Sequence, residues 1–243
     1  MHKPILGVLG GVGPMATAYF MEIVIQKTPA EKDQDNIPMI VFNDPQIPDR
    51  TAYILDHTQP NPLPEMIKVA RWLENAGSDY IAIPCNTAHY FYDSIAASVD
   101  IPVVSIMEET TKIAARTVKP GGKIGLMATD GTISSGVFQK YLEDAGLETV
   151  VPDSKYQKDV MHIIYDCVKS NEPYDKDEFL AVANHLRDKG CDMVVIGCTE
   201  LSVVYQDLAD ELPDWQFDAL DALADRCVEY YIEERKHRIE LDI

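Results

Sequence analysis

The sequence has little of three features that mark particular protein classes: long apolar runs, paired cysteines and basic residues. No apolar run approaches the roughly 18 residues that a membrane-spanning helix requires, so a membrane protein is not expected. The five cysteines include no Cys-x-x-Cys pair, and no group of His and Cys has the spacing of zinc ligands. The sequence therefore predicts neither a membrane span nor a metal site.

Basic residues are scarce, because 21 Lys and Arg face 40 Asp and Glu, which leaves a net charge of −19. A field of this sign repels nucleic acids and anionic membranes, so neither is an expected partner. It also repels small anions, and a site that binds one must be locally positive. Each Arg or Lys near a candidate site is therefore more informative than usual.

The start of the sequence and the cysteines predict the compartment. Residues 1–4 lead into a short strand-like stretch, without the small-residue cleavage signature of a signal peptide. An odd number of cysteines at irregular spacing argues against a disulfide framework. We expect a cytoplasmic protein whose thiols are free.

Short apolar stretches alternate along the chain with segments of helical periodicity. The strand-like stretches are residues 6–9, 39–42, 80–83, 102–106, 123–128, 148–151 and 193–196. The helical segments are residues 15–27, 64–75, 108–118, 137–145, 159–169, 176–189 and 218–237, and residues 46–61 read as a long polar loop. This alternation predicts an α/β protein with parallel sheets covered on both faces.

Two segments repeat one pattern, in which Gly-x-Asp precedes an apolar stretch, a cysteine and small polar residues. They are residues 77–87 (GSDYIAIPCNT) and 190–200 (GCDMVVIGCTE), with the cysteines offset by 198 − 85 = 113. A weaker echo relates residues 7–20 to residues 125–138, at an offset of 118. The duplication predicts two similar α/β domains with a cleft between them. We expect residues 1–105 plus 215–243 to form the first domain and residues 106–214 the second.

Cys85 and Cys198 occupy the same place in the two copies, at the exit of an apolar strand. In open α/β sheets this is the end at which ligands bind. N–H groups at the start of the following helix, with the hydroxyl of Thr87 beside the first thiol, would stabilise a thiolate. A lone buried cysteine usually acts as a small apolar residue, but the matched pair favours a functional role. The other cysteines lack such a counterpart and are interpreted as structural.

Residues 11–16 (GVGPMA) match the G-x-G-x-x-A fingerprint of dinucleotide-binding turns. Asp44, near the end of the second strand, would be the ribose-binding acid of such a site. The alternative is a turn whose backbone N–H groups approach a small carboxylate, with the hydroxyls of Thr129 and Thr132 doing the same in the second copy. A dehydrogenase explains neither cysteine, so the carboxylate interpretation is preferred.

Arg50 and Lys169 are the candidate anion anchors in this acidic chain. Arg50 lies in the polar loop, and its planar guanidinium suits a carboxylate. Lys169 ends a helical segment, where a positive charge also stabilises the helix itself. His89, four residues after the first cysteine, is interpreted as a helix residue rather than a partner of the thiol, and the role of Glu200 stays open.

Four stretches together resemble the cofactor-independent aspartate/glutamate racemase family. They are residues 7–17 (GVLGGVGPMAT), 43–51 (NDPQIPDRT), 84–89 (PCNTAH) and 197–200 (GCTE), and the resemblance covers nearly the whole chain. It implies a pair of Rossmann-like domains related by pseudo-two-fold symmetry, with the active site in the interdomain cleft. It also implies a homodimer.

The resemblance assigns roles by position. The two catalytic cysteines of the family correspond to Cys85 and Cys198. The residues that we predict to bind the substrate are Asp49, Arg50, Thr51, Asn86, Thr87, Ala88, Thr129, Lys169 and Thr199. Within this set, the resemblance implies that the arginine and the lysine receive the side-chain carboxylate of aspartate.

These observations predict an isomerase that interconverts L- and D-aspartate by two-base 1,1-proton transfer, without pyridoxal phosphate or another cofactor. One thiolate removes the α-proton of the bound amino acid, and the opposite thiol donates a proton to the other face. A glutamate or broad-specificity racemase of the same family is the alternative, and a nucleotide-binding oxidoreductase is a weaker one. The expected partners are an acidic amino acid and a second copy of the chain.

Overall fold

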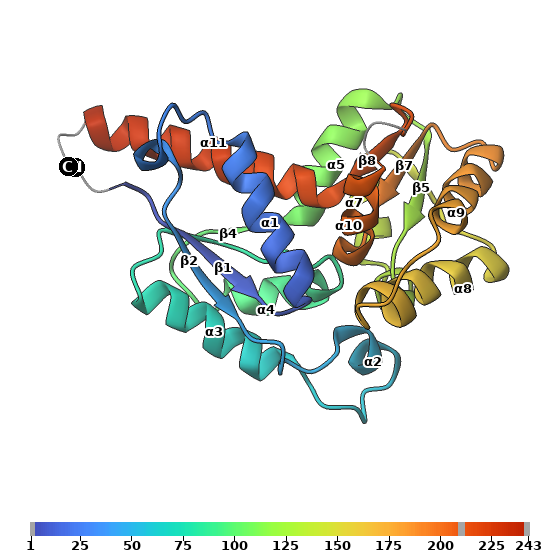
Figure 1. Cartoon of the computed structure of the whole chain (residues 1–243), viewed down its shortest axis with the longest axis horizontal. Helices are drawn as coiled ribbons and strands as arrows, with labels where there is room; N and C mark the ends of the chain where they lie inside the picture. Colours follow the sequence, from blue (N-terminus) through green and yellow to red (C-terminus); the bar gives the residue numbers. More distant parts are fainter. Residues whose placement is uncertain (1–2, 209–211, 241–243) are drawn as a thin grey trace.

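The computed structural model describes residues 3–208 and 212–240 and contains two parallel four-stranded sheets, one in each half of the molecule (Figure 1). The first sheet has the order β2-β1-β3-β4, from β1 (Leu6–Gly10), β2 (Met39–Asn43), β3 (Tyr80–Ala82) and β4 (Val103–Val104). The second has the order β6-β5-β7-β8, from β5 (Lys123–Met127), β6 (Glu148–Val150), β7 (Met193–Ile196) and β8 (Gln216–Asp218). Numbered within its own half, each sheet has the same strand order, which confirms the predicted pair of similar α/β domains.

Helices connect the strands and cover both sheets (Figure 1). In the first half they are α1 (Pro14–Lys27), the 3-10 turn η1 (Asp33–Asp35), α2 (Arg50–Leu55), α3 (Leu63–Asn75), the 3-10 segment η2 (Thr87–Phe91), α4 (Tyr92–Ala96) and α5 (Ile106–Thr117). In the second half they are α6 (Asp130–Ser135), α7 (Val137–Asp144), α8 (Ser154–His162), the π-helical segment η3 (Ile163–Val168), α9 (Lys176–Asp188), α10 (Thr199–Asp207) and α11 (Ala219–Glu240). In the described part of the chain, no helix combines the length and apolar character that crossing a membrane requires.

Strand β3 illustrates why the sheets are covered on both faces. Its side chains alternate between two clusters of buried apolar residues, as the two-residue period of a strand requires. Tyr80 and Ala82 pack into a cluster with α1 and α11, whereas Ile81 packs into a cluster with α3 and α4. Since every residue of β3 is fully buried, the stretch reads as continuously apolar in the sequence.

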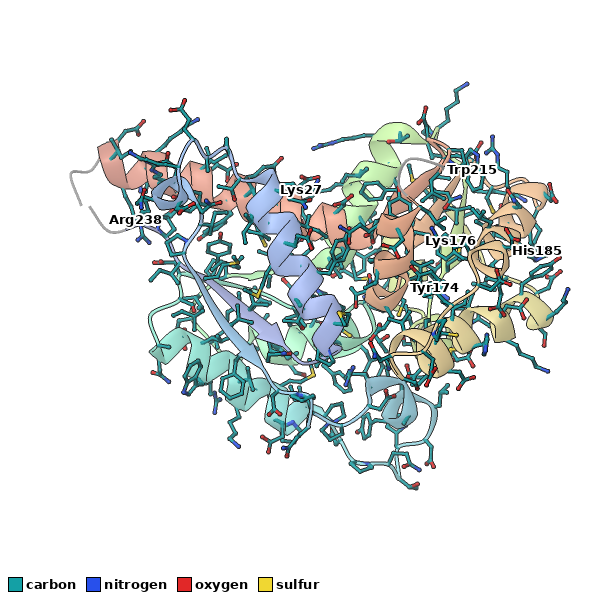
Figure 2. The ribbon with its side chains drawn as sticks, viewed as in Figure 1. Lys27, Tyr174, Lys176, His185, Trp215 and Arg238 are labelled. Carbon is teal, nitrogen blue, oxygen red and sulfur yellow. The ribbon has the colours of Figure 1, made fainter. Side chains whose placement is uncertain are left out.

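Helix α11 joins the two halves. It follows β8 of the second sheet but packs against α1 and α5 of the first half. Lys27, at the end of α1 beside α11 (Figure 2), pairs with Asp225 at 2.8 Å, and the Tyr80 hydroxyl donates to the carbonyl of Cys227 at 2.9 Å. One apolar cluster contains Leu6 of β1 together with Ile124 of β5 and residues of α11. The halves therefore share one core beneath α5 and α11.

The structure corrects two element predictions. The predicted loop 46–61 contains helix α2, because the Asp49 carboxylate accepts the Ala52 N–H at 2.8 Å and caps the helix. The predicted strand 102–106 is reduced to β4, because the Ser105 hydroxyl accepts a backbone N–H in the first turn of α5 at 3.2 Å and starts that helix.

Strand β8 is missing from the sequence prediction. It pairs in parallel with β7, from Val194 with Gln216 to Ile196 with Asp218, so these residues lie in the second sheet. The sequence pattern predicts that residues 215–243 belong to the first domain, and α11 does pack on α1 of that domain. The division of the chain into domains stays a prediction.

Candidate active site

The residues singled out by their chemistry lie at the carboxyl ends of the central strands. Cys85 follows β3 and Cys198 follows β7, while the glycine turn follows β1 and Thr129 follows β5. Thr129 is the N-cap residue of α6, and Cys198 is the N-cap residue of α10. This edge is where parallel α/β sheets bind ligands, so the fold brings each cysteine to the functional edge of its own sheet.

A small cavity of about 10 Å³ lies at this edge. Its lining comes from both halves: Val12, Asp49, Arg50, Thr51, Cys85, Thr87, Thr129, Lys169 and Glu200. The volume is below the roughly 300–1,000 Å³ of usual ligand pockets, so the structure is a closed form that must open to admit a ligand. A larger, open depression beside the cavity is lined by the same four charged residues. They therefore lie between the cavity and solvent, and they are Asp49, Arg50, Lys169 and Glu200.

Two cations, one from each half, face the cavity. Arg50 begins α2, is 7% exposed, and its positive charge opposes the rise of the Cys85 pKa. Its Nη1 donates to two backbone carbonyls of the preceding loop at 3.3 and 3.1 Å, which fix the orientation of the guanidinium. Lys169 follows η3, and its Nζ lies 3.1 Å from Asp49 Oδ2. Asp49 and Glu200 also line the cavity, so its two cations are matched by two carboxylates in an otherwise strongly acidic chain.

Asp49, at the start of α2, contacts two residues of the second half. Its carboxylate pairs with Lys169 and accepts the Tyr165 hydroxyl at 3.1 Å. Burial opposes ionisation, but Lys169 and the capping N–H outweigh it and lower the pKa of Asp49. Helix α2 also packs closely on α6, where a Cβ on Gly131 would lie 2.8 Å from the Thr51 Cα. Helix α2 therefore closes the cavity through contacts between the halves.

Three threonine hydroxyls form a ring beside the first cysteine. Thr87 Oγ1 lies 3.0 Å from Thr129 Oγ1 and 2.9 Å from Thr132 Oγ1, and the latter two are 3.1 Å apart. All three side chains are buried, and the ring joins the first half to the second. Hydroxyls rotate freely between donor and acceptor roles, so the ring can reorganise around a ligand.

Several buried polar atoms around the cavity have no hydrogen-bond partner within the described residues. They are both side-chain atoms of Asn86, Oγ1 of Thr199, Oε1 of Glu200 and Nε of Arg50. Buried polar groups are almost always paired, so a cluster of unpaired ones indicates a site that a ligand completes. Asn86 and Thr199 follow the two cysteines in the chain, and Arg50 and Glu200 line the cavity. A ligand that pairs with these atoms would bind beside the thiols.

The two thiols have different electrostatic surroundings. Burial raises the pKa of Cys85, and the Arg50 guanidinium opposes that rise. Burial and then the Glu200 carboxylate raise the pKa of Cys198 well above its usual value. Lys169 and a nearby backbone N–H group, that of Ala88 for Cys85 and that of Glu200 for Cys198, act to lower both pKa values. The same lysine and glutamate therefore act on the pKa values of both sulfurs.

His89 is a structural residue. Its Nδ1 lies 2.9 Å from the carbonyl of Cys85, and its Nε2 accepts the N–H of Ile106 at 3.1 Å. Burial lowers the pKa of His89 to about 4, so the ring is neutral near pH 7, with Nδ1 carrying the proton. The histidine therefore ties the exit of β3 to the start of α5 and does not polarise the thiol.

The glycine turn faces a carboxylate of the protein itself. A Cβ on Gly13 would lie 2.5 Å from Glu200 Oε1, so a larger residue there would require the Glu200 carboxylate to move. The approach to the turn is therefore occupied by negative charge, which repels the pyrophosphate of a dinucleotide. The Asp44 carboxylate accepts the Gln46 N–H at 3.0 Å within its own turn. This geometry disfavours the nucleotide-binding interpretation.

Most of the predicted substrate residues meet at the cavity, and the rest lie beside it in the chain. The predicted residues outside the lining are Asn86, Ala88, Cys198 and Thr199. Tyr165, which contacts Asp49, has no signal in any local pattern, whereas Val12 lies within the glycine turn but was not predicted as a site residue. Among residues 3–208 and 212–240, no group of three or more His, Cys, Asp or Glu is arranged to hold a metal ion.

The sequence model of the Asp/Glu/hydantoin racemase family matches residues 9–227. The chain belongs to this family. It is 29% identical to a broad-specificity amino-acid racemase of Bacillus subtilis, over 93% of this chain and 98% of that protein. It is also similar to the structure of Picrophilus torridus aspartate racemase, with a TM-score of 0.82, 29% identity and 94% of each chain covered.

A more distant racemase shares the fold. Glutamate racemase from Francisella tularensis, solved with D-glutamate, superposes with a TM-score of 0.67 at 17% identity, over 96% of this chain and 82% of that one. Membership of the Asp/Glu/hydantoin racemase family makes this protein a racemase, an isomerase acting on a small molecule. The family also confirms the resemblance drawn from the four sequence stretches.

Proposed function

We propose that this protein interconverts L- and D-aspartate without a cofactor, with Cys85 and Cys198 as the two bases. The observation that carries the proposal is the shared environment of the two sulfurs. The charges of Lys169 and Glu200 act on both sulfurs, beside one cavity around which several buried polar atoms lack partners within the described residues. Two thiols from two halves of one site are what proton exchange on opposite faces of a carbon requires.

In the proposed reaction one thiolate removes the α-proton and becomes a thiol. The electron pair passes into the α-carboxylate, which becomes an enediolate-like group stabilised by hydrogen-bond donors in the closed cavity. The opposite thiol then protonates the other face of the α-carbon and becomes a thiolate. The reaction consumes nothing, and the two cysteines exchange protonation states with each turnover.

The proposed substrate contacts follow from charge and from the unpartnered groups. Arg50 and Lys169 are the cations available to the two carboxylates of aspartate, and an arginine is suited to bidentate pairing. Asn86, Thr87 and Thr199 supply neutral donors and acceptors beside the two thiols. Because Lys169 pairs with Asp49 in the closed form, substrate entry must exchange that ion pair for one with the ligand.

A broader specificity is the second candidate. The 29% identity to the Bacillus subtilis broad-specificity racemase spans nearly all of that protein and equals the identity to the Picrophilus torridus aspartate racemase. In a broad-specificity enzyme, Arg50 would bind the α-carboxylate common to all amino acids, and Lys169 would stay paired with Asp49. The homodimer and the cytoplasmic location remain predictions.

A panel of amino acids tests the proposal. The purified protein is incubated with each enantiomer of aspartate, glutamate and alanine, without added cofactor, and the products are separated on a chiral column. We expect fast interconversion of aspartate, slower reaction of glutamate and none of alanine. Equal rates for alanine and aspartate would favour the broad-specificity racemase, and stabilisation by NAD without any racemisation would revive the oxidoreductase.

A further inference from the structure

The second cysteine has a partner for which the first has no equivalent. Cys198 Sγ donates a hydrogen bond to Glu200 Oε2 at 3.1 Å, inside the same turn of α10. Glu200 is 5% exposed, and its other oxygen, Oε1, is buried without a hydrogen-bond partner in the described part of the chain. A carboxylate with one oxygen on a thiol is a strong acceptor that favours the protonated sulfur.

The matching position in the first half is neutral. Two residues after Cys85 the chain has Thr87, whose hydroxyl belongs to the threonine ring, and the charge with the largest effect on the Cys85 pKa is the guanidinium of Arg50. A cation within reach of a sulfur stabilises its thiolate, whereas a carboxylate stabilises its thiol. The duplicated scaffold therefore carries opposite charges at its two cysteines.

We propose that Glu200 is a positioning residue that keeps the Cys198 proton in place, so that the resting protein holds Cys198 as the acid and Cys85 as the base. The inference rests on the proposed two-thiol racemisation, but it concerns only the order in which the two thiols lose their protons. Glu200 acts through Cys198 and takes no proton from the substrate. The opposite protonation state, with Cys198 ionised beside Glu200, is reached only during turnover.

The order of ionisation cannot be read from the racemisation rates. The two enantiomers have equal free energies, so kcat/KM must be the same in both directions whatever the resting state. Direct titration of each thiol avoids this limit. Iodoacetamide is small and neutral and reacts with thiolates, so the pH midpoint of alkylation at each cysteine reports its pKa.

The experiment follows iodoacetamide labelling of Cys85 and Cys198 by peptide mass spectrometry between neutral and alkaline pH. It compares the wild-type protein, Glu200→Gln, and a control, Glu229→Gln, which removes one charge from an exposed site on α11. In the wild type we expect Cys85 to be labelled at a lower pH than Cys198. In Glu200→Gln the Cys198 midpoint falls, and its labelling rate near neutral pH rises by about tenfold or more.

The control should leave both midpoints unchanged, and Cys85 should respond to Glu200→Gln less than Cys198 does. A Cys198 midpoint at or below that of Cys85 in the wild type would overturn the proposal without any variant. A Glu200→Gln protein that still racemises but keeps the Cys198 midpoint would also overturn it. If no amino acid is racemised although the midpoints behave as expected, the proposed function fails and the ionisation order stands.

Discussion

The two halves of this protein share a strand order and a strand–cysteine–helix junction, but they surround the cysteine with different charges. In the first half the sulfur of Cys85 lies near the Arg50 guanidinium. In the second half the thiol of Cys198 donates a hydrogen bond to the carboxylate of Glu200. A duplicated backbone supplies two thiols at matched positions. The side chains around them then give the thiols unequal affinities for a proton.

A second pair of junctions differs in the same way. After β4, the hydroxyl of Ser105 caps α5, and after β8, the carboxyl of Asp218 accepts the Leu220 N–H at 3.0 Å at the start of α11. The Asp218 carboxyl also accepts the Ser202 hydroxyl at 2.7 Å. Both helices enter the core shared by the halves. The capping group of one junction is an uncharged hydroxyl, while that of the other is a buried acid.

Removing either thiol should have the largest effect on the proposed activity. Cys85→Ala and Cys198→Ala each delete one acid–base group, so racemisation of aspartate should fall by roughly 10²- to 10⁴-fold. Each variant should still exchange the α-proton of one enantiomer with solvent, and the two variants should prefer opposite enantiomers. Chiral chromatography and NMR of the α-proton measure both properties. A single variant that racemises at the wild-type rate would contradict the two-thiol mechanism.

Neutralising Arg50 should change the pKa of Cys85, in the first half, more than that of Cys198, in the second. Arg50→Gln removes a buried charge-assisted donor, and kcat/KM for aspartate should fall roughly ten- to hundredfold. Because the guanidinium lowers the pKa of Cys85, its loss should raise that pKa and move the ascending limb of the pH–rate profile to higher pH. Lys169→Gln is the matched change in the second half. Identical pH profiles for Arg50→Gln and the wild type would contradict the assignment.

The buried acid before α11 should make stability depend on pH. Burial, then Asp221, raise the pKa of Asp218 from its ordinary 3.8 to about 7. The folded protein therefore binds the proton more tightly than the unfolded chain, and stability is lost as pH rises from about 4 to about 7. Asp218→Asn removes this loss, which is on the order of 4 kcal/mol.

Urea unfolding of Asp218→Asn and the wild type at acidic and alkaline pH measures the difference. The asparagine keeps an oxygen for the Ser202 hydroxyl and the Leu220 N–H. We expect the variant to gain stability over the wild type only on the alkaline side. An equal gain at both pH values, or none, would contradict an acid that titrates between them.

The neutral junction should give the smallest effect. Ser105→Ala removes the cap of α5, which should lower the free energy of unfolding by about 1 kcal/mol. Because the Ser105 hydroxyl carries no charge, the loss of unfolding free energy should be the same at acidic and alkaline pH. Thermal unfolding at both pH values checks it. A loss that changes with pH would remove the contrast between the two junctions.

The sequence predicts those parts of the fold that depend on local pattern. Continuous apolar stretches identify the buried central strands, and the repeat around the two cysteines identifies the two similar halves. Strand β8 and helix α2 are not predicted, because the sequence pattern around each is weak. Gln216–Asp218 begins and ends with polar residues, and α2 has six residues in a loop rich in proline, where only the Asp49 cap marks its start.

The site was predictable as a set of positions but not as a set of contacts. The cysteines and the residues next to them follow from strand exits and from the resemblance to a family. The pairing of Asp49 with Lys169, or of Cys198 with Glu200, depends on how the halves close on each other. Contacts between distant segments leave no local periodicity, which is why Tyr165 has no signal in the sequence.

Racemisation in heavy water tests the central claim, that thiols from the two halves act on opposite faces of one α-carbon. The protein is incubated with L-aspartate in D₂O, and both enantiomers are analysed early by chiral separation and mass spectrometry. Two bases predict that nearly every D-aspartate formed carries deuterium at the α-carbon, while the remaining L-aspartate keeps its hydrogen. D-aspartate that retains the original hydrogen, or deuterium entering both enantiomers at the same rate, would contradict the claim.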